Sequence, residues 1–177
     1  NEETNLGRCL DSAKDIVDEI VVIDSGSTDD TRGIAELHRA VWVDQPWLGY
    51  VRQKNAGLER CANDWVLSLD ADEALSAHLK KEISIIKSAP EPGISGYSFP
   101  RCVFFEGKWI RHGDWYPDRL VRLFKRSKAE FRGDKVHERL HLEGEVGQLN
   151  GEIEHYSFKS AEDQKNRMTH YSELWAE

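Results

Sequence analysis

The fold is decided by the segment WVLSLDADE, residues 65–73, in which a short apolar run stops abruptly at three carboxylates. An apolar run of this length is typical of a strand covered on both faces, and open α/β sheets bind ligands at the carboxyl ends of such strands. Side chains at positions i and i+2 of an extended chain point the same way, so Asp70 and Asp72 are expected to face one target. Two oxygen ligands that leave positions for water and phosphate favour Mg²⁺ or Mn²⁺ over zinc.

A second strand with the same kind of end lies upstream: EIVVID, residues 19–24, followed by SGSTDDT, residues 25–31. Gly26 allows a tight turn, and Ser27 or Thr28 is a good N-cap for a helix over 29–38. A strand, a turn of small residues and a helix start are typical of a nucleotide site, although neither the dinucleotide fingerprint nor the P-loop is matched. An EF-hand is excluded because neither acidic loop has glycine at its sixth position. Two such strand ends in one chain favour a function over two ordinary polar loops.

Composition limits the class of protein. The chain has 177 residues, enough for one domain with a real core, and its 39% hydrophobic and 32% charged content is typical of soluble globular proteins. No apolar stretch approaches the ~20 residues of a membrane span. Cys9, Cys61 and Cys102 lack paired spacing, which favours a reducing, cytoplasmic compartment. A net charge of −8 argues against nucleic-acid binding, so an anionic substrate would need a metal ion or clustered arginines.

Six tryptophans are many for this length. Aromatic faces often line sugar sites, and the alternative is that these side chains simply fill the core. The sequence alone does not favour either reading for any one of them.

The first half alternates between helices and strands, which predicts a mostly parallel sheet with helices on both sides. The expected elements are a helix with Leu6 and Leu10, strands over 19–24, 40–43 and 65–70, helices over 29–38 and 50–62, and a helix from Ser76 that stops before Pro90. The second half predicts a hairpin over 96–105 and 108–111, strands over 120–125 and 136–142, and a last helix over 161–176.

Six motifs occur in order along nearly the whole chain: Asn1-Glu2-Glu3, VVIDSGSTDDT from Val21, PWLGYVRQKNAGL from Pro46, VLSLDADE from Val66, GDWYPDRLVRLFKR from Gly113 and VHERL from Val136. The series resembles family-2 inverting glycosyltransferases of the GT-A fold, in particular the bacterial lipopolysaccharide-core β-1,4-glucosyltransferases. The resemblance implies an α/β fold with a mostly parallel central sheet, flanked by helices, and a smaller mixed or antiparallel C-terminal part. Residues 1–95 would form the nucleotide-sugar-binding half, and residues 96–177 the acceptor-side half of the same domain.

The resemblance implies how the donor would be held. Asp24 would contact the uracil or ribose of the nucleotide, in a loop with Ser25 and Gly26. Asp70 and Asp72 occupy the D-x-D positions, the first nearer the ribose and the second holding the metal on the diphosphate, so both are candidate metal ligands.

Basic and catalytic roles are implied further along the chain. Lys54 matches a basic position beside the nucleotide. Glu138 falls where these enzymes keep the general base, and Asp118 is the competing candidate. Arg119 and Arg122 would assist the phosphates or an anionic acceptor, or else be solvent-facing residues of an edge strand.

The implied reaction is metal-dependent and inverting. A hexose, by default glucose, would move from a nucleotide sugar, by default UDP-linked, to a saccharide or lipid-linked saccharide acceptor in lipopolysaccharide-core or other cell-envelope glycan biosynthesis. Mg²⁺ or Mn²⁺ would stabilise the leaving diphosphate while a carboxylate takes the proton of the acceptor hydroxyl. Such an enzyme would be cytoplasmic, with peripheral association on the cytoplasmic face of the inner membrane and no nucleic-acid partner.

The chain departs from the family pattern at both ends. Family members normally have an apolar central strand just before the Asn-Glu-Glu motif, and a doubly wound sheet without it should not be stable, so an upstream segment is expected in the native protein. The subgroup usually continues past the position of Glu177 with further helices. This chain is therefore expected to be a catalytic core with an incomplete acceptor site.

Two other functions compete with this interpretation. HERLH, residues 137–141, matches the zinc-protease motif H-E-x-x-H, which requires a helix so that both histidines share one face. Its apolar residues alternate with period two and glycines flank it, so a strand is favoured. A nucleotide-sugar-binding module without activity is the third possibility, against which the intact Asp70, Asp72 and Glu138 argue.

Overall fold

The computed structural model describes residues 1–89, 91–133, 138–158 and 162. The predicted last helix over 161–176, apart from residue 162, and His137 lie outside the described residues.

The first half of the chain alternates between helices and strands, as predicted. Its elements are α1 (Leu6–Ala13), β1 (Val21–Asp24), α2 (Thr31–Leu37), β2 (Val41–Asp44), α3 (Tyr50–Arg60), β3 (Trp65–Leu67), β4 (Glu73–Leu75) and α4 (Ala77–Ser88). Ser76 caps α4 as expected, since its side chain accepts a hydrogen bond from the backbone N–H of Leu79. The cap expected at Ser27 or Thr28 is not formed, because α2 begins later, after Asp30.

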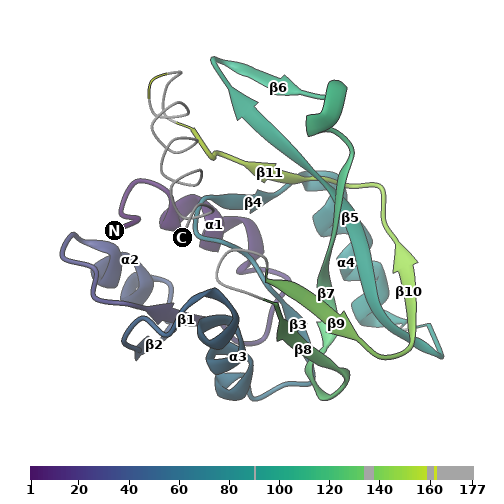
Figure 1. The fold of residues 1–177 in the computed structure, drawn as a ribbon, viewed down its shortest axis with the longest axis horizontal. Helices are drawn as coiled ribbons and strands as arrows, with labels where there is room; N and C mark the ends of the chain where they lie inside the picture. Colours follow the sequence, from purple (N-terminus) through teal and green to yellow (C-terminus); the bar gives the residue numbers. More distant parts are fainter. Residues whose placement is uncertain (90, 134–137, 159–161, 163–177) are drawn as a thin grey trace.

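Strands dominate the second half. They are β5 (Ile94–Phe105), β6 (Lys108–Ile110), β7 (Asp118–Lys125), β8 (Ala129–Arg132), β9 (Arg139–Leu142), β10 (Glu145–Gln148) and β11 (Ile153–His155), with short 3₁₀ turns η1 (Gly113–Trp115) and η2 (Arg126–Lys128). Long β5 and short β6 form the predicted hairpin, which projects from the body of the molecule (Figure 1).

The main sheet is mixed rather than mostly parallel. Its strand order is β3-β7-β5-β11-β4, with β6 and β10 also paired to β5. β5 pairs with β7 and β6 in antiparallel fashion, whereas β10 and β11 run parallel to it. The difference from the prediction arises because β5, β6 and β7 follow one another through short connections, which favour antiparallel pairing.

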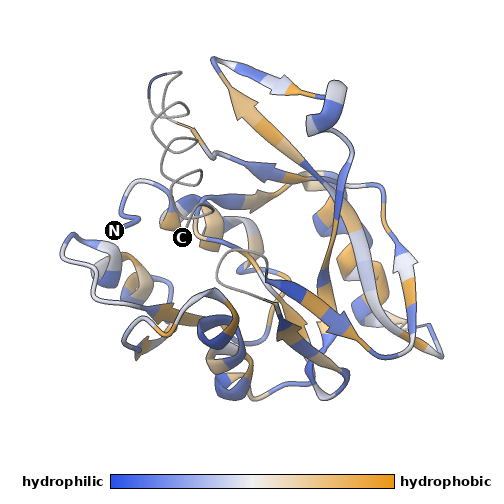
Figure 2. Ribbon diagram, in the orientation of Figure 1, coloured by the Kyte–Doolittle hydropathy of each residue, from blue (hydrophilic) through white to orange (hydrophobic). Residues whose placement is uncertain are grey.

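The core of the main sheet lies against α4. Leu79, Phe99 and Ile153 are fully buried there in one cluster with Leu75 and Ile83. Figure 2 shows apolar residues along α4 and β5, which this cluster joins. A separate cluster holds α1 against α2 through Leu6, Leu10 and Ala35. Among the described helices, none combines the length and apolar character needed to cross a bilayer.

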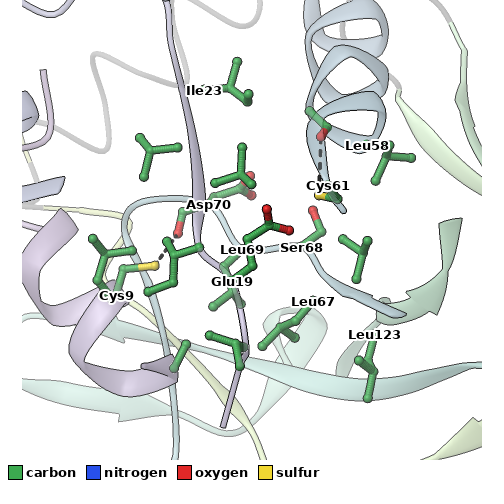
Figure 3. A pocket seen from close by; sticks show the side chains of 18 of the residues that line it. Cys9, Glu19, Ile23, Leu58, Cys61, Leu67, Ser68, Leu69, Asp70 and Leu123 are labelled. Carbon is green, nitrogen blue, oxygen red and sulfur yellow. Dashed lines mark hydrogen bonds between the residues drawn. The ribbon is translucent and has the colours of Figure 1, made fainter. Parts of the chain in front are cut away.

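The sheet is interrupted between β1 and β3. Within the described residues, β1 pairs only with β2, and β3 only with β7. The two strands instead line a cavity of about 790 Å³, whose wall is mostly apolar and includes Ile23, Leu67 and Leu69 (Figure 3).

Candidate active site

The Asp24 loop is held by the carboxylate of Asp24 itself. That carboxylate accepts hydrogen bonds from the backbone N–H groups of Gly26 and Ser27, both at 2.7 Å, and from the Ser27 hydroxyl. Burial opposes ionisation, but the hydrogen bonds from Ser27 and Gly26 outweigh it and lower the pKa of Asp24. Gly26 has φ +98°, a conformation that favours glycine. The loop is therefore a rigid turn at the end of β1.

Asp70 lies between two cations at the end of the β3 segment. Its Oδ2 is 2.7 Å from Arg122, and its Oδ1 is 3.5 Å from Lys54 Nζ. Partial burial opposes the negative charge, but Arg122 and Lys54 hold the pKa of Asp70 well below its usual value. Asp70 is thus ionised and fixed in orientation.

A buried ion pair between Glu73 and Arg122 holds Asp70 in place. Glu73 is 1% exposed, and its Oε1 lies 3.0 Å from Arg122, which is 7% exposed. The other oxygen of Glu73 accepts the backbone N–H of Asp70 at 2.9 Å. The alternative that Arg122 is a solvent-facing residue of an edge strand is wrong, because β7 lies between β3 and β5 and turns this side chain inward. Arg119, in contrast, is exposed and donates to backbone carbonyls of Ser98 and Leu149.

Asp72 has a different partner from Asp70. Its Oδ2 is 3.4 Å from Nε2 of His155, at the end of β11. The expectation that both aspartates face one target assumed an extended chain, whereas the strand ends at Leu67 and residues 71–72 form a turn. The turn is closed by a hydrogen bond from Glu73 N–H to the Asp70 carbonyl.

His155 is a functional candidate that sequence reasoning missed. No local motif marks it, because 83 positions separate it from Asp72 in the sequence. The antiparallel register of β11 with β4 places His155 opposite Glu73 and so next to Asp72. Its Nδ1 is buried and has no hydrogen-bond partner within the described part of the chain. Only pairing of β11 with β4 brings this imidazole to the acidic turn.

Three consecutive residues of α3 reach three parts of the site. Gln53 donates to the Ser25 hydroxyl at 2.9 Å, beside Asp24. Lys54 lies 3.2 Å from Oε1 of Glu138. Asn55 makes paired hydrogen bonds with the backbone of Phe131 on β8, both at 2.9 Å. Because β8 pairs with β9, this tether holds the strand that follows Glu138 against α3.

Asp118, the other candidate base, is tied to an arginine. Its Oδ2 accepts hydrogen bonds from both Nε and Nη2 of Arg101, at 3.0 and 2.7 Å. Arg101 also lies 3.5 Å from the buried Glu73. Asp118 therefore belongs to the same ionic network as Asp70, and Arg101 and Glu73 lie between the two aspartates in that network.

The zinc-protease hypothesis lacks its required helix. Residues 139–142 form strand β9, with His141 exposed on it. His137 lies outside the described residues. Among the described residues, no group of three or more histidine, cysteine, aspartate or glutamate side chains has the spacing of a complete metal cage.

The cavity between β1 and β3 differs from the ionic site in chemistry. Asp70 and Asp72 contribute to its lining, but most of the wall is apolar (Figure 3). Cys9 is buried beside it, and burial, followed by the nearby charges of Glu73 and Asp70, raises the pKa of its thiol to about 12. A thiol with this pKa stays protonated at neutral pH and does not act as a nucleophile.

Comparisons with known proteins identify the family. The model of glycosyl transferase family 2 matches residues 1–139. The chain is 35% identical to the uncharacterised glycosyltransferase RT0209 of Rickettsia typhi over 97% of this chain and 62% of that protein. It is 33% identical to the lipopolysaccharide core biosynthesis glycosyltransferase LpsC of Rhizobium meliloti over 100% of this chain and 67% of that protein.

A solved structure shows the same fold. The structure of S. aureus TarS residues 1–349 superposes with a TM-score of 0.59 at 15% identity, over 89% of this chain and 58% of that chain. The chain therefore belongs to glycosyl transferase family 2 and has the GT-A fold. It spans 62% of the length of RT0209.

Proposed function

We propose that this chain is the catalytic core of a metal-dependent, inverting glycosyltransferase that moves a hexose from a nucleotide sugar to a saccharide acceptor. One observation carries the proposal: Lys54 bridges Asp70 and Glu138, at 3.5 and 3.2 Å, so a donor-binding carboxylate and a candidate base share one cation. An acceptor hydroxyl at Glu138 would then stand close to a donor held at the acidic turn. The choice of UDP as the nucleotide and glucose as the hexose rests on the resemblance of the motifs.

The residues at the acidic turn suit a divalent cation. Asp72 offers a carboxylate oxygen and His155 an imidazole nitrogen, 3.4 Å apart, which is close to the separation of neighbouring ligands around one ion. Asp70 is already paired with Arg122, so we assign the metal to Asp72 and His155, with Asp70 beside them. A nitrogen ligand favours Mn²⁺ over the harder Mg²⁺. A bound cation supplies Lewis-acid stabilisation of the charge that develops on the leaving diphosphate.

Glu138 is the better placed of the two candidate bases. Its carboxylate takes the proton of the acceptor hydroxyl as that oxygen bonds to the anomeric carbon, and the bond from that carbon to the diphosphate breaks with its electron pair leaving on phosphate oxygen. Attack from the face opposite the diphosphate inverts the configuration. Asp118 is less well placed to accept a proton, because its Oδ2 already accepts two hydrogen bonds from Arg101.

The acceptor class follows the relative LpsC, whose name places it in lipopolysaccharide core biosynthesis. We infer a saccharide acceptor of the cell envelope. The alternative of a binding module without activity predicts nucleotide binding with no turnover.

A turnover assay separates these functions. UDP release from UDP-glucose is measured with Mn²⁺ and a heptose-containing core oligosaccharide, with and without chelator. Release that requires both Mn²⁺ and acceptor supports the transferase, and UDP binding without release supports the module. Product anomeric configuration, read by NMR, tests inversion.

A further inference from the structure

We propose that Phe105, Trp115 and Phe158 form the platform on which a pyranose ring of the acceptor stacks. The inference deepens the proposed function and rests on it. These three side chains are called the site-face triad.

The site-face triad is a compact aromatic surface beside the turn end of the projecting β5–β6 hairpin, where Phe105 pairs with Lys108. The Phe105 ring lies 5.8 Å from Trp115 and 6.0 Å from Phe158, and the last two rings are 6.0 Å apart. All three residues are only partly buried. They come from the end of β5, from η1 and from the segment after β11.

The sheet register places this triad on the face that carries the ionic site. His155 pairs with both Val103 and Glu73, so these side chains share one face of the sheet. Phe105 is two residues beyond Val103 on the same strand and therefore points to that face as well. Arg101, two residues before Val103, is also on it and contacts Glu73. Phe105 is thus the next residue on this face of β5 after Val103, the residue that pairs with His155.

Polar groups border the triad on the same face. Trp115 precedes Asp118 by three residues, and Asp118 is paired with Arg101. A pyranose presents an apolar face of C–H groups and a rim of hydroxyls, so it needs an aromatic surface with donors and acceptors beside it. A lipid chain would need an apolar surface without such a rim. The combination therefore fits a sugar ring rather than an acyl chain.

The hairpin also carries an internal control. Phe104 pairs with Trp109 across β5 and β6, on the opposite face, where both rings contact Tyr156. This far-face triad has similar ring distances, but Arg8 covers Tyr156 at 3.7 Å. Loss of Trp109 and loss of Trp115 should therefore disturb the hairpin alike, while only Trp115 lies on the face of the ionic site.

The test compares W115A, W115F and W109A in the full chain. With UDP-glucose, Mn²⁺ and the heptose-containing core oligosaccharide, we expect W115A to raise the acceptor KM about 5- to 10-fold, far more than the donor KM. W115F should recover most of the loss, and W109A should leave the acceptor KM near the wild-type value. Equal effects of W115A and W109A on the acceptor KM would show a purely structural role and overturn the inference.

A second readout does not depend on turnover. Saturation-transfer NMR with methyl β-D-glucopyranoside and a methyl heptoside should show contact with one ring face in the wild-type chain and in W109A, but not in W115A. Absence of transfer to either glycoside in the wild type would overturn the platform even if turnover is observed. Loss of binding to phosphatidylglycerol vesicles in W115A, with an unchanged glycoside signal, would assign the surface to a membrane instead. A wild-type chain that contacts the glycosides but turns over no nucleotide sugar would contradict the proposed function alone.

Discussion

Lys54 Nζ lies 3.2 Å from Glu138 Oε1 and joins the candidate base to the helix that also contacts the Asp24 loop. Lys54 and Glu138 are far apart in the sequence. The hydrogen bonds between Asn55 and Phe131 bring their segments together, because they hold β8 against α3. The candidate base and the residues proposed to bind the donor are therefore held in place by the same helix, α3.

Removing the base should separate binding from chemistry. For Glu138→Gln we expect transfer to fall by about 10²–10⁴-fold, because general-base catalysis has this magnitude, while Mn²⁺-dependent UDP binding persists. Single-turnover transfer and calorimetric UDP binding measure the two effects. If Asp118→Asn shows this pattern and Glu138→Gln does not, Asp118 is the base.

Lys54 should affect both steps. In Lys54→Met the carboxylates of Asp70 and Glu138 lose their shared cation, and we expect kcat/KM to fall by about 10- to 100-fold, the worth of a hydrogen bond to a charged group. Lys54→Arg keeps the charge and should recover part of the activity. Steady-state kinetics with varied donor show whether kcat, donor KM or both change. Wild-type kinetics in Lys54→Met would refute the bridge.

The buried pair beneath Asp70 should govern stability. Arg122→Met leaves buried Glu73 with only the more distant Arg101, at 3.5 Å, so we expect a loss of about 3–5 kcal/mol in the free energy of unfolding. Arg132→Met is the matched control, because Arg132 and Glu130 form an exposed pair whose loss should cost less than about 1 kcal/mol. Urea unfolding at pH 7 measures both. Equal effects of the two changes would mean that the buried pair adds nothing.

Stability should also depend on pH through Asp24. A carboxyl group with a lowered pKa in the folded state contributes stability above its ordinary pKa of about 4, and this contribution is lost as pH falls toward the folded pKa. Asp24→Asn cannot titrate, so its Tm should fall less steeply between about pH 5 and pH 3. Scanning calorimetry across this range provides the slope for each chain. Parallel slopes would show that Asp24 is not linked to folding.

Local patterns in the sequence were sufficient for the other elements of the first half, the β5–β6 hairpin, β7 and β9, but they did not predict β4, β8, β10 or β11. The apolar runs before Asp24 and Asp70 end in the loops expected of them, and Ser76 caps its helix. The partners of those residues depend on register between distant strands, which no local pattern encodes. For Arg122 the sequence left open a role at the phosphates and a place on a solvent-facing edge strand, and only the internal position of β7 excludes the second. His155 reaches Asp72 only through the pairing of β11 with β4.

The central claim is that Asp72 and His155 hold a divalent cation for a nucleotide diphosphate. It is tested most directly by titrating Mn²⁺ into the chain saturated with UDP and following free Mn²⁺ by electron paramagnetic resonance. We expect one tight Mn²⁺ site in the wild type, its loss in Asp72→Asn, a clear weakening in His155→Ala, and an unchanged site in His141→Ala. Equal Mn²⁺ binding by the wild type and Asp72→Asn, or none by the wild type, would contradict the claim.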